Sequence, residues 1–354
     1  MKKIFLLLVI FLFVFIHPIF SDEISCGGFV LKTLEDSGAF SIAYQENNGK
    51  QKDFFISHDE FSTTYFSAKI GNVIYKLNRE SSVDFSTYRT ENSIGVNYQI
   101  GKDIYIYVDL SFVPEFDGVN QSAVKVEVTV QNLSSKSQSV SLKGIFDTHL
   151  GENSGPHFST AINPYITSEL DFYSMEKDKW IRSSNGRYSI QFLLDGTGIT
   201  KPSNVVLSNK DVLCNSAWTP VAKAGRSFNS VFSYNNSALA VQWNPMVVSP
   251  ATKSSVCFYI TCSNSGVAPA NSDFLGKEIK TSALNVNDEV VYQDEYGTTY
   301  TMGALEEAQL DPKYIEDLLN RIRWLEAEPD NVDRNELLQL NAELDAILEK
   351  IRQL

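Results

Sequence analysis

The chain has 354 residues, with 43 acidic and 30 basic side chains and a formal net charge of −13 at pH 7. An acidic surface is repelled by polyanions, so nucleic acid and anionic membrane surfaces are disfavoured as partners. The length allows two domains, or one large all-β domain with an appendage.

The first 21 residues have the pattern of a secretory signal peptide. Lys2 and Lys3 precede an apolar run over 4–16 that is shorter than the about 20 residues of a membrane-spanning helix. Such a signal would direct the chain to the periplasm or the outside, and its cleavage after Ser21 would take the charge from −13 to −15. Two alternatives stay open, a retained N-terminal anchor and a lipid attached at Cys26.

An exported chain meets an oxidising compartment, where an even number of cysteines favours disulfides. Cys257 and Cys262 are five residues apart in one predicted strand, so their side chains point to opposite faces. We therefore expect Cys214 to pair with one of them, and Cys26 with the other. No CxxC occurs, which argues against a zinc knuckle or a thioredoxin-type redox site.

From about residue 28 to 262 the chain alternates apolar and polar residues between turn signals, the pattern of successive antiparallel strands. The clearest alternation covers 123–132, and the returning run over 140–146 predicts a hairpin with it. Further strands are predicted at 104–113, 188–194, 204–207, 227–234, 239–243 and 255–262. Residues 22–262 should form one large antiparallel β-sandwich, with two smaller sandwiches as the alternative. At the level of fold alone, this resembles the mutarotase-like supersandwiches and sugar-binding sandwiches of bacterial envelopes.

Residues 263–303 read as a linker that could hold a short hairpin through 290–292 and 298–302. In 304–354 the apolar period changes to that of a helix, which predicts a helical hairpin. Its second helix has apolar residues three and four positions apart, the spacing of a coiled-coil seam. This seam, which could bind a partner, a second copy or the sandwich, consists of Leu337, Leu340, Leu344, Ile347, Ile351 and Leu354.

Two histidines and two carboxylates follow the strand that ends at 146, and they are the candidate metal ligands: Asp147, His149, Glu152 and His157. Such a set could hold zinc or calcium, although its spacing matches no established motif. Residues of these types also serve turns through backbone hydrogen bonds alone. No HExxH, GxSxG or P-loop occurs, so no catalytic residue or other cofactor is predicted.

Tyr105 and Tyr107 could stack against sugars if they faced outward, but aromatic residues in sandwich strands usually belong to the core, and we predict that here. The leading hypothesis is a non-enzymatic envelope subunit that contacts a partner, or itself, through the C-terminal helices. The alternative is a carbohydrate-binding or carbohydrate-active sandwich.

Overall fold

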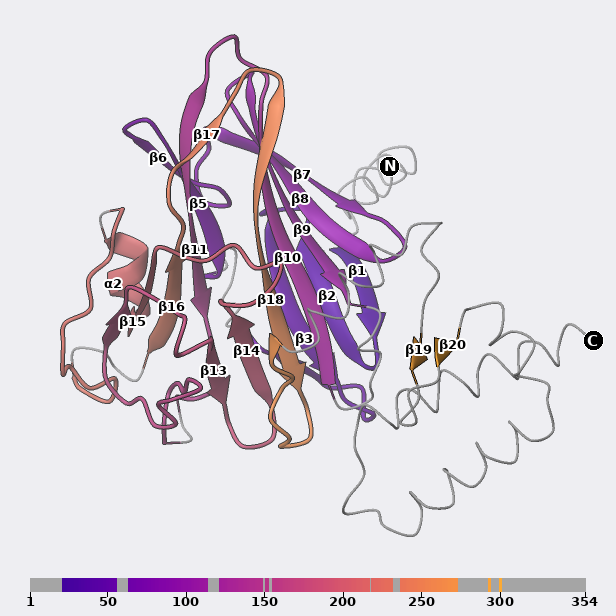
Figure 1. Ribbon diagram of the computed structural model, residues 1–354, viewed down its shortest axis with the longest axis vertical. Helices are drawn as coiled ribbons and strands as arrows, with labels where there is room; N and C mark the ends of the chain where they lie inside the picture. The colour runs from indigo at the N-terminus through magenta and orange to yellow at the C-terminus, as the bar shows by residue number, and fades with distance from the viewer. Residues whose placement is uncertain are drawn as a thin grey trace, which may run out of the picture. The chain divides into compact units, whose positions relative to one another are not determined.

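The computed structural model describes residues 21–55, 63–113, 121–148, 150–152, 155–216, 218–231 and 236–272, with two short pairs of residues further on at 292–293 and 299–300. The chain divides into a unit spanning 1–278 and a second spanning 279–354. The first unit is mainly β, with several antiparallel sheets (Figure 1). Within the described ranges, no helix is both long and apolar enough to cross a bilayer.

A seven-stranded sheet, here the first large sheet, has the order β13-β14-β18-β10-β9-β8-β7, and every neighbouring pair is antiparallel. Its strands are β7 (Val83–Arg89), β8 (Ser93–Ile100), β9 (Ile104–Phe112), β10 (Gln121–Asn132), β13 (Trp180–Ser184), β14 (Ser189–Leu193) and β18 (Thr252–Ser263). Burial alternates along β9, where every second residue from Ile104 to Leu110 is buried and those between are half-buried. One face of this sheet therefore packs into the core.

The second large sheet has the order β12-β15-β16-β11-β5-β6, and β17 also pairs with β11. Its strands are β5 (Tyr65–Ile70), β6 (Val73–Lys76), β11 (Gln138–Asp147), β12 (Leu170–Phe172), β15 (Asn204–Asn209), β16 (Ser237–Gln242) and β17 (Met246–Val248). A smaller sheet of four strands contains β1 (Ser21–Cys26), β2 (Phe29–Leu34), β3 (Ala39–Gln45) and β4 (Gln51–Asp53).

The two large sheets share one aromatic core. Phe146 of the second sheet lies 4.9 Å from Phe192 and 5.7 Å from Phe258 of the first, measured between ring centroids. Phe66 also stands against Phe258, at 6.5 Å. Because these rings come from both sheets, the sheets pack face to face, and each has an outer face turned away from this core.

The hairpin predicted from 123–132 and 140–146 is wrong, although both strands exist. β10 pairs with β9 and β18, whereas β11 pairs with β5, β16 and β17. The connection between β10 and β11 therefore passes from one sheet to the other. The buried Asn132 holds this crossing, because its side-chain amide donates to the carbonyl oxygens of Lys136 and Val248 at 2.8 and 2.9 Å.

No strand is formed over 227–231, the described part of the strand predicted at 227–234. These residues form a loop that makes one isolated bridge, between Ser168 and Ser227. Conversely, the short helix α2 (Lys210–Asn215) was not predicted. The side chain of Asn209 accepts hydrogen bonds from the backbone N–H groups of Asp211 and Val212 and so caps its N-terminus.

Cys214 and Cys262 are free thiols, so the prediction of a disulfide between Cys214 and either Cys257 or Cys262 is wrong. Cys262 lies in the core between the large sheets, whereas Cys214 lies on α2 over the outer face of the second sheet. Cys26 and Cys257 are half-buried. The fold places Cys214 and Cys262 on opposite faces of the second sheet, which explains why they do not meet.

The described residues of the second unit form one antiparallel pair, β19 (Tyr292–Gln293) with β20 (Thr299–Tyr300), in the region where the sequence suggested a short hairpin. The predicted signal peptide and the predicted helical seam, Leu337 to Leu354, lie outside the described residues, apart from Ser21. Both stay predictions.

Candidate functional site

Three of the four predicted metal ligands gather at one end of β11 and β16. Asp147 ends β11 and is 1% exposed. Its backbone N–H donates to Thr64 Oγ1 at 3.0 Å, and Thr63 Oγ1 donates to its carboxylate. Glu152 Oε1 accepts a hydrogen bond from the backbone N–H of Ser237 at 3.3 Å. His149 lies outside the described residues.

The imidazole of His157 is fully buried and makes hydrogen bonds through both nitrogens. Nδ1 lies 2.7 Å from Ser237 Oγ, and Nε2 lies 3.1 Å from the side-chain oxygen of Asn229. The ring also stacks on Phe228, with centroids 4.8 Å apart. A Ser–His pair can generate a nucleophile, but Ser237 is itself 1% exposed, so its hydroxyl is buried with the imidazole.

This cluster is therefore built as an internal polar network. Among the described residues no group of three or more His, Cys, Asp or Glu side chains is placed to hold a metal ion. Burial raises the pKa of Glu152 to about 7; the hydrogen bond from Ser237 opposes the rise, and the charge of Asp147 adds to it. The zinc or calcium site stays a prediction that depends on His149.

Part of the outer face of the second large sheet is covered. Residues 218–231, here the covering segment, reach it through Trp218 and Ala222, and α2 reaches it through Leu213 and Cys214. Lys143 of β11 is 4% exposed, and its Nζ donates to the carbonyl oxygen of Trp218 at 2.9 Å while lying 5.1 Å from the centre of the indole ring. Burial lowers the pKa of Lys143 to about 8, and the nearby charge of Lys76 adds to the shift.

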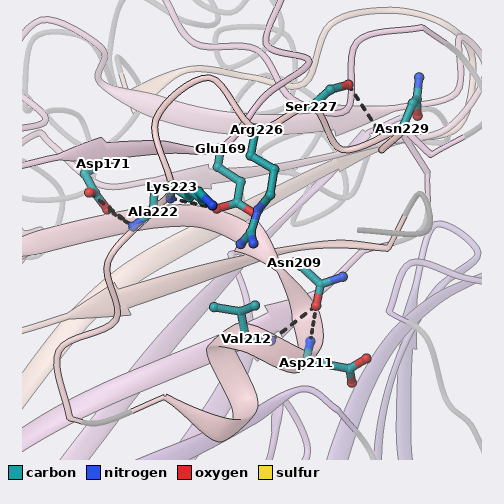
Figure 2. A network of polar contacts seen from close by, with 10 residues as sticks. All are labelled: Glu169, Asp171, Asn209, Asp211, Val212, Ala222, Lys223, Arg226, Ser227 and Asn229. Atoms are coloured by element: carbon teal, nitrogen blue, oxygen red, sulfur yellow. Dashed lines mark hydrogen bonds and ion pairs between the residues drawn. The ribbon is translucent and has the colours of Figure 1, made fainter. Parts of the chain in front are cut away.

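Two carboxylates hold the covering segment in place (Figure 2): Glu169 lies just before β12, and Asp171 lies within it. Glu169 accepts hydrogen bonds from Arg226 Nε and from the backbone N–H of Lys223, the latter at 2.8 Å. Asp171 accepts from the backbone N–H of Ala222 at 3.0 Å. The Glu169 side chain is fully buried. Its negative charge needs compensation there, and the guanidinium group of Arg226 provides it.

The outer face of the first large sheet has a different chemistry. The backbone register places Tyr88, Gly95, Asp109 and Glu127 in one row across four neighbouring strands, β7 to β10. Tyr88 reaches across β8 and donates its hydroxyl proton to Asp109. A Cβ on Gly95 would lie 2.4 Å from the Tyr88 ring, so only glycine lets the ring cross at this position.

Asp109 and Glu127 are directly opposed on β9 and β10, so their carboxylates lie on the same face. Burial raises the pKa of Asp109; the hydrogen bond from Tyr88 opposes the rise, and the charge of Glu127 adds to it. Glu127 is 36% exposed and makes an ion pair with Lys125 at 3.0 Å. The row therefore combines an aromatic ring and two carboxylates, and the ammonium group of Lys125 from the neighbouring row pairs with one of them.

The next rows add two more tyrosines. Tyr105 and Tyr107 are half-buried on this outer face, while Ile106 between them is fully buried in the core. Tyr107 donates to Gln131 Oε1 at 2.9 Å, and Lys253 Nζ lies 5.1 Å from the centre of its ring. The prediction that these aromatics belong to the core is therefore wrong. We call the set of Tyr88, Tyr105, Tyr107, Asp109 and Glu127 the tyrosine face.

Sequence reasoning singled out Tyr105 and Tyr107 but missed Tyr88, Asp109 and Glu127. The signal that could have found Asp109 and Glu127 is the alternation of β9 and β10, which places both carboxylates on the polar side of their strands. Their pairing depends on the register between strands, which one sequence does not reveal.

No family model matches the chain, and no curated protein matches it. Among solved structures, it is similar to a galactose mutarotase related enzyme from Lactobacillus acidophilus, with 9% identity over 70% of this chain and 98% of that one and a TM-score of 0.41. A galactose mutarotase-like protein from Lactobacillus casei has 10% identity over 69% and 100%, with a TM-score of 0.40. An α-N-acetylgalactosaminidase from Bifidobacterium bifidum has 9% identity over 74% and 38%, with a TM-score of 0.35. TM-scores below 0.5 do not establish a common fold, so these likenesses decide nothing about function.

Proposed function

We propose that this chain is an exported carbohydrate-binding protein and that the tyrosine face is its binding surface. The observation that carries the proposal is the outward orientation of Tyr105 and Tyr107 beside the carboxylates of Asp109 and Glu127. A tyrosine ring offers an apolar face on which a sugar ring stacks. The hydroxyl of Tyr107 donates its proton to Gln131, and its oxygen can still accept a hydrogen bond. Carboxylates beside the ring accept hydrogen bonds from sugar hydroxyls, and amides both accept and donate them.

The charges on this surface favour a neutral glycan. Lys125 balances Glu127, and Lys253 stands over Tyr107, so the acidic and basic groups offset one another. The whole chain is acidic, with a net charge of −13, and repels polyanionic glycans at long range. Residues two positions apart on one face of a strand are separated by about 7 Å. Tyr105 and Tyr107 would therefore contact neighbouring parts of an extended oligosaccharide.

A glycan array of neutral oligosaccharides, probed with the full chain, tests the proposal. We expect Tyr107→Ala to weaken binding at least about tenfold, equivalent to about 1.4 kcal/mol, because the stacking surface is lost. Tyr107→Phe keeps the ring and should retain most of the affinity. Tyr173→Ala removes a tyrosine that is 75% exposed elsewhere and should change nothing.

Absence of neutral-glycan binding by the wild type would overturn the proposal, as would equal binding by wild type and Tyr107→Ala. The opposed carboxylates Asp109 and Glu127 also favour a second candidate, acid–base hydrolysis of the bound glycan. Release of new reducing ends that is lost in Glu127→Gln would support hydrolysis. Binding without any release would leave a binding protein only.

A further inference from the structure

A cavity of about 560 Å³ lies at the other face of β7, away from the tyrosine face. Its walls are the turn between β2 and β3, the connection between β6 and β7, and the first residues of β7. The residues that line it include Asp36, Ser37, Asn78, Arg79, Glu80 and Phe85. Its volume is within the range of small-molecule sites in proteins.

Asn78 indicates a ligand site, because its buried side-chain amide lacks hydrogen-bond partners among the described residues. Its side chain is 7% exposed, and neither its amide nitrogen nor its amide oxygen has a hydrogen-bond partner among the residues that the structure describes. Buried amide groups are nearly always hydrogen-bonded, because an unpaired one costs free energy. A group that offers both a donor and an acceptor would satisfy Asn78, and the peptide unit does so with its N–H and its C=O.

Charged side chains of both signs line the cavity together with Asn78. Arg79 supplies a guanidinium group, whose carbon lies 5.5 Å from the centre of the Tyr65 ring. Asp36 and Glu80 supply carboxylates, and Glu80 Oε1 also accepts a hydrogen bond from the backbone N–H of Lys76 at 3.0 Å. A simple anion would be repelled by the two carboxylates and a simple cation by Arg79. A zwitterion is complementary to both.

The cavity also has an apolar wall. Phe85 lines it and is half-buried against the core, beside the buried Leu77 and Val83. Gly38 makes this wall compact, because a Cβ there would lie 2.8 Å from the Phe85 ring and its φ is +62°. An apolar side chain of a ligand would bury its surface against this wall.

We propose that this cavity binds a zwitterionic dipeptide with an apolar side chain. Asn78 pairs with its peptide unit, Arg79 with its carboxylate, and Asp36 or Glu80 with its ammonium group. This inference does not rest on carbohydrate binding, because the cavity and the tyrosine face use no residue in common.

Isothermal titration of the full chain with alanyl-phenylalanine tests the assignment. We expect saturable binding by the wild type and at least tenfold weaker binding by Asn78→Leu, which keeps the size of the side chain without its amide. Wild type should also prefer the free dipeptide to alanyl-phenylalanine amide, which lacks the carboxylate. Arg79→Gln should remove that preference, and it provides a second variant should Asn78→Leu fold poorly.

Tyr107→Ala should bind the dipeptide like the wild type, which separates this site from the proposed glycan surface. The inference is overturned if wild type does not bind alanyl-phenylalanine, if Asn78→Leu binds it equally, or if Arg79→Gln keeps the preference for the free carboxylate. Competition by glucose that depends on Asn78 would also overturn it, because the cavity would then hold a polyol.

Discussion

Glu152 is a residue whose protonation the fold shifts into the neutral pH range. Burial raises the pKa of its carboxyl from 4.5 to about 7. Between these two values the folded protein holds the proton and the unfolded chain releases it. The free energy of unfolding therefore falls as pH rises from 4.5 to about 7, and the stabilisation from the bound proton is complete only below 4.5.

Glu152→Gln should remove this pH dependence, because its amide does not titrate. Urea unfolding between pH 4.5 and 7.5 should show wild type losing about 1–2 kcal/mol relative to the variant, less than a fully buried carboxyl would lose. Glu176→Gln changes a carboxylate that is 68% exposed and should leave the wild-type profile intact. Parallel profiles for wild type and Glu152→Gln would contradict the prediction.

The sequence could identify polar residues that lie close to one another along the chain, but not the partners that come from distant segments. The sequence singled out Asp147, Glu152 and His157, but Ser237 and Asn229, which hydrogen-bond to His157, are 80 and 72 residues further along the chain. The burial of His157 is set by Phe228, which also comes from a distant segment. One sequence cannot report such contacts, because they arise only when the sheet is assembled.

The covering segment is an element that a few polar contacts hold on the second large sheet. Glu169 is fully buried beside Arg226, whose side chain is 20% exposed, and it also receives the N–H of Lys223. The backbone adds the hydrogen bond from Phe228 N–H to the carbonyl oxygen of Thr167 at 3.0 Å. Removing one member of a buried ion pair leaves the other without compensation, so Glu169 dominates this attachment.

We expect Glu169→Gln to lower the free energy of unfolding by about 2–4 kcal/mol and to loosen the covering segment first. Native-state trypsin digestion measures this directly, because Lys223 and Arg226 are cleavage sites within the segment. Cleavage there should be faster in Glu169→Gln than in the wild type. The matched control is Glu176→Gln, whose ion pair with Lys201 is exposed on both sides and should matter little. Equal cleavage rates would show that the pair of Glu169 and Arg226 does not hold the segment.

Elements were predictable wherever apolar and polar residues alternate, as in β9, β10 and β18, because alternation reports burial of one face. Their pairing was not predictable to the same degree. β10 and β11 follow one another with the spacing of a hairpin, yet Asn132 directs the chain into the other sheet through contacts with Val248. α2 was missed because six residues are too few for a helical period to show, although its cap, Asn209, has a helix-start side chain.

At the scale of the whole unit, the two large sheets depend on one core. Phe146 packs against Phe192 and Phe258 of the opposite sheet and against Phe55 and Phe66, with centroids between 4.9 and 6.1 Å. The outer faces of the two sheets differ. The covering segment contacts the outer face of the second large sheet, and the outer face of the first bears the tyrosine face. A shared core makes the strands behind both faces part of one cooperative structure.

Phe146→Ala should therefore destabilise both sheets together, by about 3–5 kcal/mol, because the lost ring leaves a cavity where the sheets meet. Hydrogen exchange followed by mass spectrometry resolves this by peptide. Peptides from β9 and β10 in one sheet and from β11 and β16 in the other should all exchange faster, by similar factors, in the variant. Tyr173→Ala, at a side chain 75% exposed, provides the control and should leave exchange in these strands unchanged. Faster exchange confined to β11 and β16 would show that the sheets unfold independently, and the tyrosine face would then be supported by the first sheet alone.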